Sequence, residues 1–422
     1  MRFAHIGWNL AGLLLPLMVA AATVPGLINL LGHERFGILT LAWGLIGYAS
    51  ALDLGIGRAL TLRISRLRGE GALRDVPDVV ATASRITLFA GFAGALLIAI
   101  AALCGASSKI NTTTVAAAEI THTMLLLAIA LPIQAMSATY RGVNEAYLNF
   151  KGINVLRIAL GIINFGGPFL VAQFTPALTW VISTLVMSRA IALLVFYRLA
   201  LNCTASGPDV PISRYRPEIA KSLFSFGGWV TVSSVISPVL LQADRFLIGT
   251  VLSATAVTAY VLPYEVVVQS LILVGAISSV IFPVLSKMII EQPNTWEGYF
   301  RRWLMRVSGL MLVVCVCIAL VLPFVLPAWV GASLQIESVL IGQILCIGVF
   351  ANSLGSMYYA LLHAKGRADQ TAKLHMIELP FFVAGLLFMM EKYGVAGAAW
   401  AWVGRMVFDA TVLALLARDK ND

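Results

Sequence analysis

The chain has 422 residues, of which 59% are hydrophobic and only 12% are charged. Soluble domains carry about 25% charged residues, so this composition excludes a soluble protein of two or three domains. The formal net charge of +9 is dispersed over short segments and forms no basic stripe of the kind that binds nucleic acid. The positive charges of cytoplasmic loops alone make a membrane protein basic. The composition therefore predicts a membrane protein that does not bind nucleic acid.

Twelve apolar stretches are long enough to cross a bilayer core, which takes about 20 residues of helix. Open backbone cannot face lipid, so each stretch is predicted to be an α-helix. In chain order they cover 6–31, 37–60, 80–104, 120–140, 153–173, 177–200, 222–250, 255–283, 303–326, 335–360, 371–390 and 394–416. The first is too long for a cleaved signal sequence. The expected fold is an all-α polytopic membrane protein of about twelve transmembrane helices.

Lysine and arginine gather in every second gap between these stretches. The clusters are Arg63, Arg66, Arg68 and Arg74; Arg141 and Lys151; Arg214, Arg216 and Lys221; Lys287, Arg301 and Arg302; and Lys365, Arg367 and Lys373. The intervening gaps hold little more than Arg35, Lys109 and Lys392. Because lysine and arginine stay with cytoplasmic loops, the alternation predicts that the N- and C-termini are both cytoplasmic.

The longest hydrophilic gap divides the stretches into two sets of six. We expect an N-terminal six-helix lobe at 1–205, a cytoplasmic linker at 206–221 and a C-terminal six-helix lobe at 222–422. The dipeptide Gly7-Trp8 near the start of the first lobe recurs as Gly228-Trp229 in the second. An even number of helices per lobe gives both lobes the same orientation. This parallel repeat is typical of alternating-access transporters, in which the substrate path lies between lobes.

The sequence carries no signal for a cofactor. Its cysteines are Cys104, Cys203, Cys315, Cys317 and Cys346. Their spacing matches no metal site, and no histidine lies near the closest pair. A nucleotide-binding loop of the P-loop type is also absent from the sequence, so ATP hydrolysis is not expected. We therefore expect neither a metal nor a cofactor.

Five of the arginines inside the apolar stretches are candidates for function, because a charged group costs at least about 2.5–3.5 kcal/mol at the membrane centre. They are Arg58, Arg157, Arg189, Arg245 and Arg405. Arg189 and Arg405 fall near the middle of their stretches, and Arg245 lies in the outer part of its own. Guanidinium groups bind phosphate bidentately and keep their charge, so these five residues are predicted to bind a pyrophosphate in a central cavity. For Arg58 and Arg157, snorkelling to the interface remains an alternative.

Five carboxylates in the same stretches are candidates for ion coupling. They are Asp53, Asp244, Glu265, Glu378 and Asp409. Buried carboxylates can bind and release H⁺ or Na⁺, and Glu265 follows Pro263, where a kink could expose it. Asp409 has a purely structural alternative, because it lies four residues after Arg405 and could pair with it on one helix face.

Two aromatic residues beside Glu265 are candidates for contact with a sugar. Tyr260 and Tyr264 lie on the same predicted helix as Glu265. Aromatic residues of membrane proteins more often form interfacial belts or packing, and this alternative stays open.

Two stretches carry a resemblance to a known family. They are Leu31-Gly32-His33-Glu34-Arg35-Phe36-Gly37, which runs into Leu52-Asp53-Leu54-Gly55-Ile56-Gly57-Arg58, and Gln242-Ala243-Asp244-Arg245-Phe246-Leu247-Ile248-Gly249. These resemble the first loop, second helix and seventh helix of the Wzx-type oligosaccharide flippases, and Pro283 to Ser286 resembles the end of their eighth helix. The resemblance implies membership of the multidrug/oligosaccharidyl-lipid/polysaccharide (MOP) exporter superfamily, with two lobes around a cationic cavity. It also implies that Asp53, Arg58, Asp244 and Arg245 are family-like charges.

The function implied by the resemblance is transport, not enzymatic catalysis. We expect a flippase that moves undecaprenyl-pyrophosphate-linked oligosaccharide across the bacterial inner membrane by alternating access, for the assembly of O-antigen, capsule or exopolysaccharide. Membrane lipids, a coupling H⁺ or Na⁺ and the polysaccharide polymerase machinery would be its partners. One alternative is a multidrug cation exporter of the same superfamily, which would need an acidic cavity. A membrane glycosyltransferase or polymerase is less favoured, because it needs a sizeable outer loop. A lipid II flippase usually has two further helices.

Overall fold

The computed structural model describes residues 3–48, 56–204, 214–221, 223, 242–292 and 294–418. The chain forms two compact units, Met1–Val239 and Leu240–Asp422. Every long element in the described ranges is a helix, and these ranges contain no strand. The expected all-α class is therefore confirmed.

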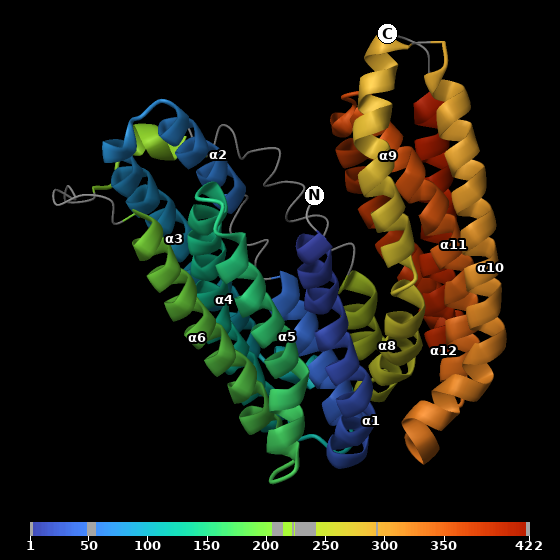
Figure 1. Ribbon diagram of the computed structural model, residues 1–422. Helices are drawn as coiled ribbons and strands as arrows, with labels where there is room; N and C mark the ends of the chain where they lie inside the picture. The colour runs from blue at the N-terminus through green and yellow to red at the C-terminus, as the bar shows by residue number, and fades with distance from the viewer. Residues whose placement is uncertain are drawn as a thin grey trace. The chain divides into compact units, whose positions relative to one another are not determined.

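The first unit is a bundle in which α4 is the central helix (Figure 1). Its helices are α1 (Phe3–Tyr48), α2 (Ile56–Gly69), α3 (Val76–Leu103), α4 (Ala117–Ala146), α5 (Phe150–Ala172) and α6 (Leu178–Thr204). α4 packs along α3 and α6 and also contacts α2, while α5 packs against α1 and α6. The side chains of α4, α5 and α6 are thereby brought close to one another.

The second unit is a bundle centred on α11. Its elements are the π-helical turn η4 (Ile248–Leu252) and the helices α8 (Ala254–Val268), α9 (Leu271–Glu291), α10 (Trp296–Val330), α11 (Glu337–Ala364) and α12 (Ala368–Arg418). α11 packs most extensively along α12 and also contacts α8, α9 and α10. In Figure 1 these helices run from yellow-green to red.

Two of the longest helices are each divided by a glycine. α1 is interrupted at Gly32 (φ 75°) and α12 at Gly394 (φ 57°), in a backbone region that glycine adopts without strain. Gly32 falls between the predicted stretches 6–31 and 37–60, and Gly394 is the first residue of the stretch 394–416, which follows 371–390. Each of these helices therefore contains parts of two predicted spans.

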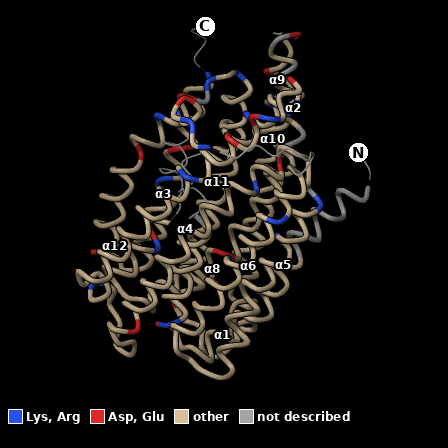
Figure 2. Tube along the Cα trace, turned by 90° about the vertical axis from the view of Figure 1, so that its left-hand side faces the viewer, with Lys and Arg blue, Asp and Glu red and all other residues tan. Residues whose placement is uncertain are grey.

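Nine helices in the described ranges are long and apolar enough to cross a membrane. Large apolar side chains are exposed along them, among them Phe89 on α3 and Phe324 on α10, which are 78% and 76% exposed. Figure 2 shows long uncharged lengths of helix, with a few charged residues partway along. These features are those of a multi-pass membrane protein. The count of twelve spans stays a prediction, since residues 49–55 and 224–241 lie outside the described ranges.

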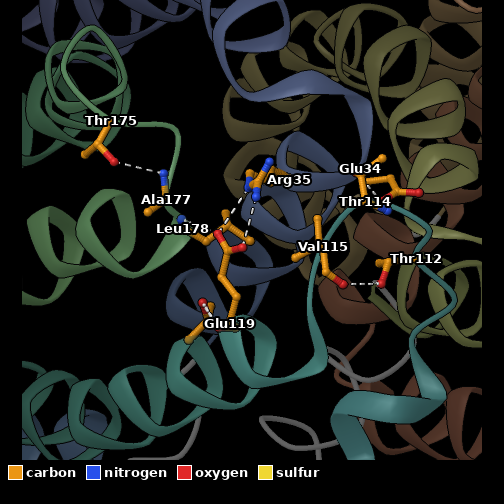
Figure 3. Close-up of polar contacts among 10 residues, drawn as sticks. Glu34, Arg35, Thr112, Thr114, Val115, Glu119, Thr175, Ala177 and Leu178 are labelled. Carbon is orange, nitrogen blue, oxygen red and sulfur yellow. Dashed lines mark hydrogen bonds and ion pairs between the residues drawn. The ribbon is translucent and has the colours of Figure 1, made fainter.

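One end of the first unit is held together by two carboxylates (Figure 3). Glu119 at the start of α4 accepts hydrogen bonds from the guanidinium of Arg35 at 3.0 and 3.1 Å and from the backbone N–H of Leu178 at 2.8 Å. Glu34 accepts four more from the backbone N–H and hydroxyl groups of Thr113 and Thr114, at 2.6–2.7 Å. These hydrogen bonds join three parts of the chain that are distant in sequence: the break in α1, the connection between α3 and α4, and the start of α6.

The chain that follows α6 is fastened back onto α3. Asp78 accepts the backbone N–H of Arg214 at 2.8 Å and pairs with the guanidinium of Arg216 at 2.5 Å. The backbone N–H of Arg216 also donates to the hydroxyl of Thr82 at 3.1 Å. The described part of the predicted linker is thus bound to the first unit. Residues 206–213 lie outside the described ranges, so the linker and the lobe boundaries remain predictions.

A substitution at Gly91 would test the close approach of α3 to α4. A Cβ at this position would lie 2.6 Å from the backbone Cα of Pro132, which cannot move like the end of a flexible side chain. Gly91→Ala is therefore expected to destabilise the unit by about 1–3 kcal/mol, as overpacking does. The measurement is the melting temperature of the purified protein. Gly309→Ala in α10 is the control, because a Cβ there meets nothing within 4 Å. Equal melting temperatures for the two variants would contradict the expected contact.

Candidate functional site

A polar pocket of about 300 Å³ lies among α4, α5 and α6 of the first unit. Its charged lining residues are all arginines, with Arg141 on α4, Arg157 on α5 and Arg189 on α6. Its other lining residues are Gln134, Ser137, Ala138, Ile153, Leu160, Gly161, Asn164, Ala192 and Phe196. None of the described residues that line this pocket is acidic. The pocket is therefore suited to an anion.

The lining residues follow helical spacing. On α4 they fall at Gln134, Ser137 and Arg141, and residues three or four apart share one face of a helix. α5 and α6 repeat the pattern, with Arg157 and Asn164 seven residues apart and Arg189 three residues before Ala192. Sequence reasoning placed Arg141 among the topology-setting loop residues and missed Asn164. The recurrence of polar side chains every three, four and seven residues was the signal that could have found both.

Arg189 is held by a neutral partner. Its Nη2 donates to the amide oxygen Oδ1 of Asn164 at 2.9 Å, and the Asn164 backbone carbonyl accepts from the Trp43 indole N–H at 3.1 Å. The buried Nε of Arg189 has no hydrogen-bond partner among the described residues. Arg157 is exposed, and Arg141 pairs at 3.6 Å with the half-exposed Glu145. A buried guanidinium with an unused donor is prepared to accept an anionic ligand.

The second unit pairs its buried arginines with carboxylates. Arg245 Nη2 donates to Glu265 Oε1 at 2.7 Å, and the Arg245 guanidinium lies 4.8 Å from the centre of the Tyr264 ring. Asp244 is almost fully buried and accepts the hydroxyl of Tyr260 at 2.8 Å. The structure therefore brings together, at α8, four of the predicted site residues: Asp244, Arg245, Tyr260 and Glu265.

Both tyrosines predicted to contact a sugar are packed inside the unit. Tyr260 is fully buried, and Tyr264 is 7% exposed and lies against the Tyr260 and Trp402 rings. In this arrangement both side chains serve as packing and as partners of buried charges. Their role in binding a glycan stays a prediction.

A second group of buried charges lies between the two segments of α12. Arg405 Nε on the second segment donates to Glu378 Oε1 on the first at 3.2 Å, and these side chains are 8% and 3% exposed. Asp409 Oδ1 lies 3.5 Å from His375 Nε2. Sequence reasoning offered Asp409 as the partner of Arg405 because the two are four residues apart. The structure pairs Arg405 with Glu378, which belongs to the other segment of α12, and places Asp409 beside His375.

This group also comes nearest to a metal site among the described residues. One nitrogen or oxygen atom from each of His375, Glu378 and Asp409 lies within 4.8 Å of the others, close enough to hold an ion. The guanidinium of Arg405 places a fixed positive charge in the same group. That charge opposes a divalent cation by Coulomb repulsion.

Two predicted site residues cannot be placed. Asp53 lies outside the described residues, and for Arg58 the structure describes the helix backbone but not the side chain. Their predicted roles therefore stay predictions.

Comparison with known proteins gives three consistent similarities. Residues 3–289 match the family described as polysaccharide biosynthesis protein. The chain is 31% identical over 409 residues to a putative O-antigen transporter of Shigella flexneri, covering 96% of this chain and 95% of the relative. It is 21% identical over 374 residues to the lipopolysaccharide biosynthesis protein WzxC of Escherichia coli strain K12, covering 88% of this chain and 71% of that protein.

The fold is similar to that of solved transporters. An inward-facing multidrug resistance MATE family transporter of the MOP superfamily superposes with a TM-score of 0.78, covering 97% of each chain at 14% identity. At this identity the likeness shows the fold alone. It confirms the expected MOP-type architecture.

The buried pair between the two segments of α12 gives a test of stability. Arg405→Met leaves the buried Glu378 without its guanidinium, and removal of one partner of a buried pair costs about 3–5 kcal/mol. We therefore expect a clearly lower melting temperature for the purified variant. Adding Glu378→Gln should restore part of the loss, because the uncompensated carboxylate is then removed.

The matched control is Lys373→Met, which breaks an ion pair with Asp369 on the same helix. Both of those side chains are more than half exposed, so solvent screens the pair and the melting temperature should hardly change. Equal effects of Arg405→Met and Lys373→Met would contradict a stabilising role for the buried pair.

Proposed function

Because the chain belongs to the polysaccharide biosynthesis protein family, we propose that it is a flippase for undecaprenyl-pyrophosphate-linked oligosaccharide. It would move the lipid-linked glycan across the bacterial inner membrane by alternating access, with both chain termini in the cytoplasm. The glycan would then enter the assembly of a surface polysaccharide such as O-antigen, capsule or exopolysaccharide, through polymerase machinery. The names of the relatives, an O-antigen transporter and a lipopolysaccharide biosynthesis protein, support this class of substrate.

The observation that carries the proposal is the positive charge of the pocket in the first unit. Arg141, Arg157 and Arg189 line it, and no described lining residue is acidic. Planar guanidinium groups match the oxygens of a pyrophosphate in bidentate geometry. A volume of about 300 Å³ lies at the small end of the range of ligand pockets, so it suits the pyrophosphate rather than the attached glycan.

We assign secondary roles to the other predicted site residues. Arg245 and Arg405 are already paired with Glu265 and Glu378, so their charges are less available to a substrate than that of Arg189. Arg58 keeps its proposed place in the cationic cavity. Asp53, Asp244, Glu265, Glu378 and Asp409 remain candidates for coupling to H⁺ or Na⁺, and Tyr260 and Tyr264 for contact with the glycan.

A multidrug cation exporter would need the opposite charge. A cationic drug requires carboxylates in the binding pocket, whereas the described lining of this pocket contains three arginines. The similarity to a multidrug transporter at 14% identity concerns the fold and does not extend to the ligand.

Arg189→Ala is expected to reduce transport strongly. Loss of a hydrogen bond to a charged group costs about 1.5–3 kcal/mol, or roughly ten- to hundredfold in affinity. Cells that carry the variant in place of the wild type should accumulate lipid-linked glycan on the inner leaflet and lose surface polysaccharide. Arg189→Lys should retain part of the activity, because it keeps the charge but loses the bidentate geometry.

Arg198→Ala is the control, because Arg198 is exposed on the same helix and does not line the pocket. It removes the same charge and should leave export unchanged. Normal surface polysaccharide in the Arg189→Ala strain would refute the proposed site. Normal polysaccharide combined with drug sensitivity in a strain that lacks the protein would instead favour a drug exporter.

A further inference from the structure

The inner end of the pocket in the first unit carries neutral amide groups beside an arginine. Gln134 on α4, Asn164 on α5 and Arg189 on α6 form this end, near the middle of their helices. We propose that Gln134 is a specificity-determining residue that binds the sugar attached to the pyrophosphate. The assignment rests on the proposed flippase function, because it gives a second part of the same substrate to the same pocket.

Gln134 and Arg189 lie at a similar height in the bundle. α4 and α6 run in the same direction, and near their ends Asn144 donates to the backbone carbonyl of Phe196 at 3.2 Å. Gln134 lies ten residues before Asn144, and Arg189 lies seven residues before Phe196. At a rise of about 1.5 Å per residue, the two heights agree within about one helical turn. The hydrogen bond from Arg189 brings Asn164 to the same level.

The pocket is longer than a pyrophosphate. Its polar lining residues extend along α4 from Gln134 to Arg141, which is seven residues or about 10 Å. Along α5 they extend over the same number of residues, from Arg157 to Asn164. Two linked phosphate groups cover only part of this length. The remainder faces the next group of the substrate, and a volume of about 300 Å³ admits a single ring there but not the whole glycan.

The outer end of the pocket, formed by Arg141 and Arg157, decides which way the substrate lies. Arg157 is exposed. The apolar undecaprenyl chain stays in lipid, so the phosphate nearest to it is held at the exposed end. The second phosphate then lies toward Arg189, and the first sugar lies toward Gln134.

The side chain of Gln134 does not match a phosphate. An ionised phosphate offers only acceptors, and guanidinium groups supply the donors that it needs. The amide of Gln134 has an acceptor oxygen as well as its N–H donors. A sugar hydroxyl or acetamido group also donates and accepts, so it can satisfy both halves of the amide. The sequence of groups along the pocket therefore follows the sequence of groups in the substrate.

Gln134 has both halves of its amide available. It is half-buried, and no hydrogen bond joins its side chain to another residue in the described part of the chain. Asn164 is different, because its Oδ1 already accepts from Arg189 at 2.9 Å. The half-buried Gln343 of α11 is also engaged, since it donates to the backbone carbonyl of Ala319 at 3.1 Å. A polar group inside an apolar helix costs free energy without a partner, and a sugar would supply the partner of Gln134.

Two kinds of side chain would then divide the work of binding. The arginines bind the pyrophosphate whatever sugar it carries. Gln134 adds affinity only when the first ring presents a group that both donates and accepts hydrogen bonds at its position. A site built to bind such a group discriminates against a ligand that lacks it. Gln134 therefore contributes preference among substrates and not affinity for the pyrophosphate.

The preference is measured by the binding of two lipids to the purified full-length protein. One is undecaprenyl pyrophosphate without a sugar. The other is the same lipid with only its first sugar, extracted from a strain blocked in the second glycosyl transfer. We expect the wild type to bind the second lipid more tightly. Gln134→Met keeps the length of the side chain without its hydrogen-bonding groups. This preference should fall roughly three- to tenfold, with unchanged binding of the sugar-free lipid.

Gln173→Met is the matched control, because Gln173 is exposed at the end of α5 and does not line the pocket. It should bind both lipids as the wild type does. Arg189→Ala should weaken the binding of both lipids, since both carry the pyrophosphate. Should Gln134→Met fail to fold, Gln134→Ala gives the same comparison.

The outcomes separate this assignment from the proposed function. Equal affinity of the wild type for the two lipids would overturn the role of Gln134, as would an unchanged preference in the folded Gln134 variant. An equal loss of affinity for both lipids would also overturn it, because the amide would then serve the pyrophosphate. Failure of the wild type to bind either lipid would refute the flippase function itself, on which the assignment rests.

Discussion

The rest of the structure depends on the inability of a hydrocarbon environment to solvate charge. Each ionised group inside a helix must find a partner within the protein, and the two units meet this demand differently. The second unit pairs Arg245 with Glu265 and Arg405 with Glu378. The first unit gives Arg189 only the neutral amide of Asn164 as its hydrogen-bond partner among the described residues. The first unit therefore keeps a positive charge available, whereas the second unit pairs its buried arginines with carboxylates.

This difference decides where an anionic substrate can bind. An anionic headgroup needs guanidinium groups that face it, and α4, α5 and α6 supply three of them around one pocket. Arg245 and Arg405 of the second unit are already paired with carboxylates. Under the proposed function, recognition of the pyrophosphate is therefore a property of the first unit.

Hydropathy predicted most of the helices in the described ranges. The stretch 120–140 lies within α4, and the breaks expected after 31 and 390 occur at Gly32 and Gly394. The partners of the charged residues were harder to predict, because partner choice depends on how each helix is rotated. Helices that are apolar on most sides carry little information about rotation. For this reason the pairing of Arg405 with Glu378, 27 residues earlier, was not anticipated.

The carboxylates that close one end of the first unit also impose an order on its assembly. Arg35 is synthesised 84 residues before Glu119, and Glu34 is synthesised 79 residues before Thr113. Because chains emerge from the ribosome N-terminus first, both side chains wait without these partners while α2 and α3 are made. Glu119 in turn receives the N–H of Leu178 only when α6 begins. The hydrogen bonds at this end of the unit are therefore completed only when α6 begins, long after Glu34 and Arg35 have been synthesised.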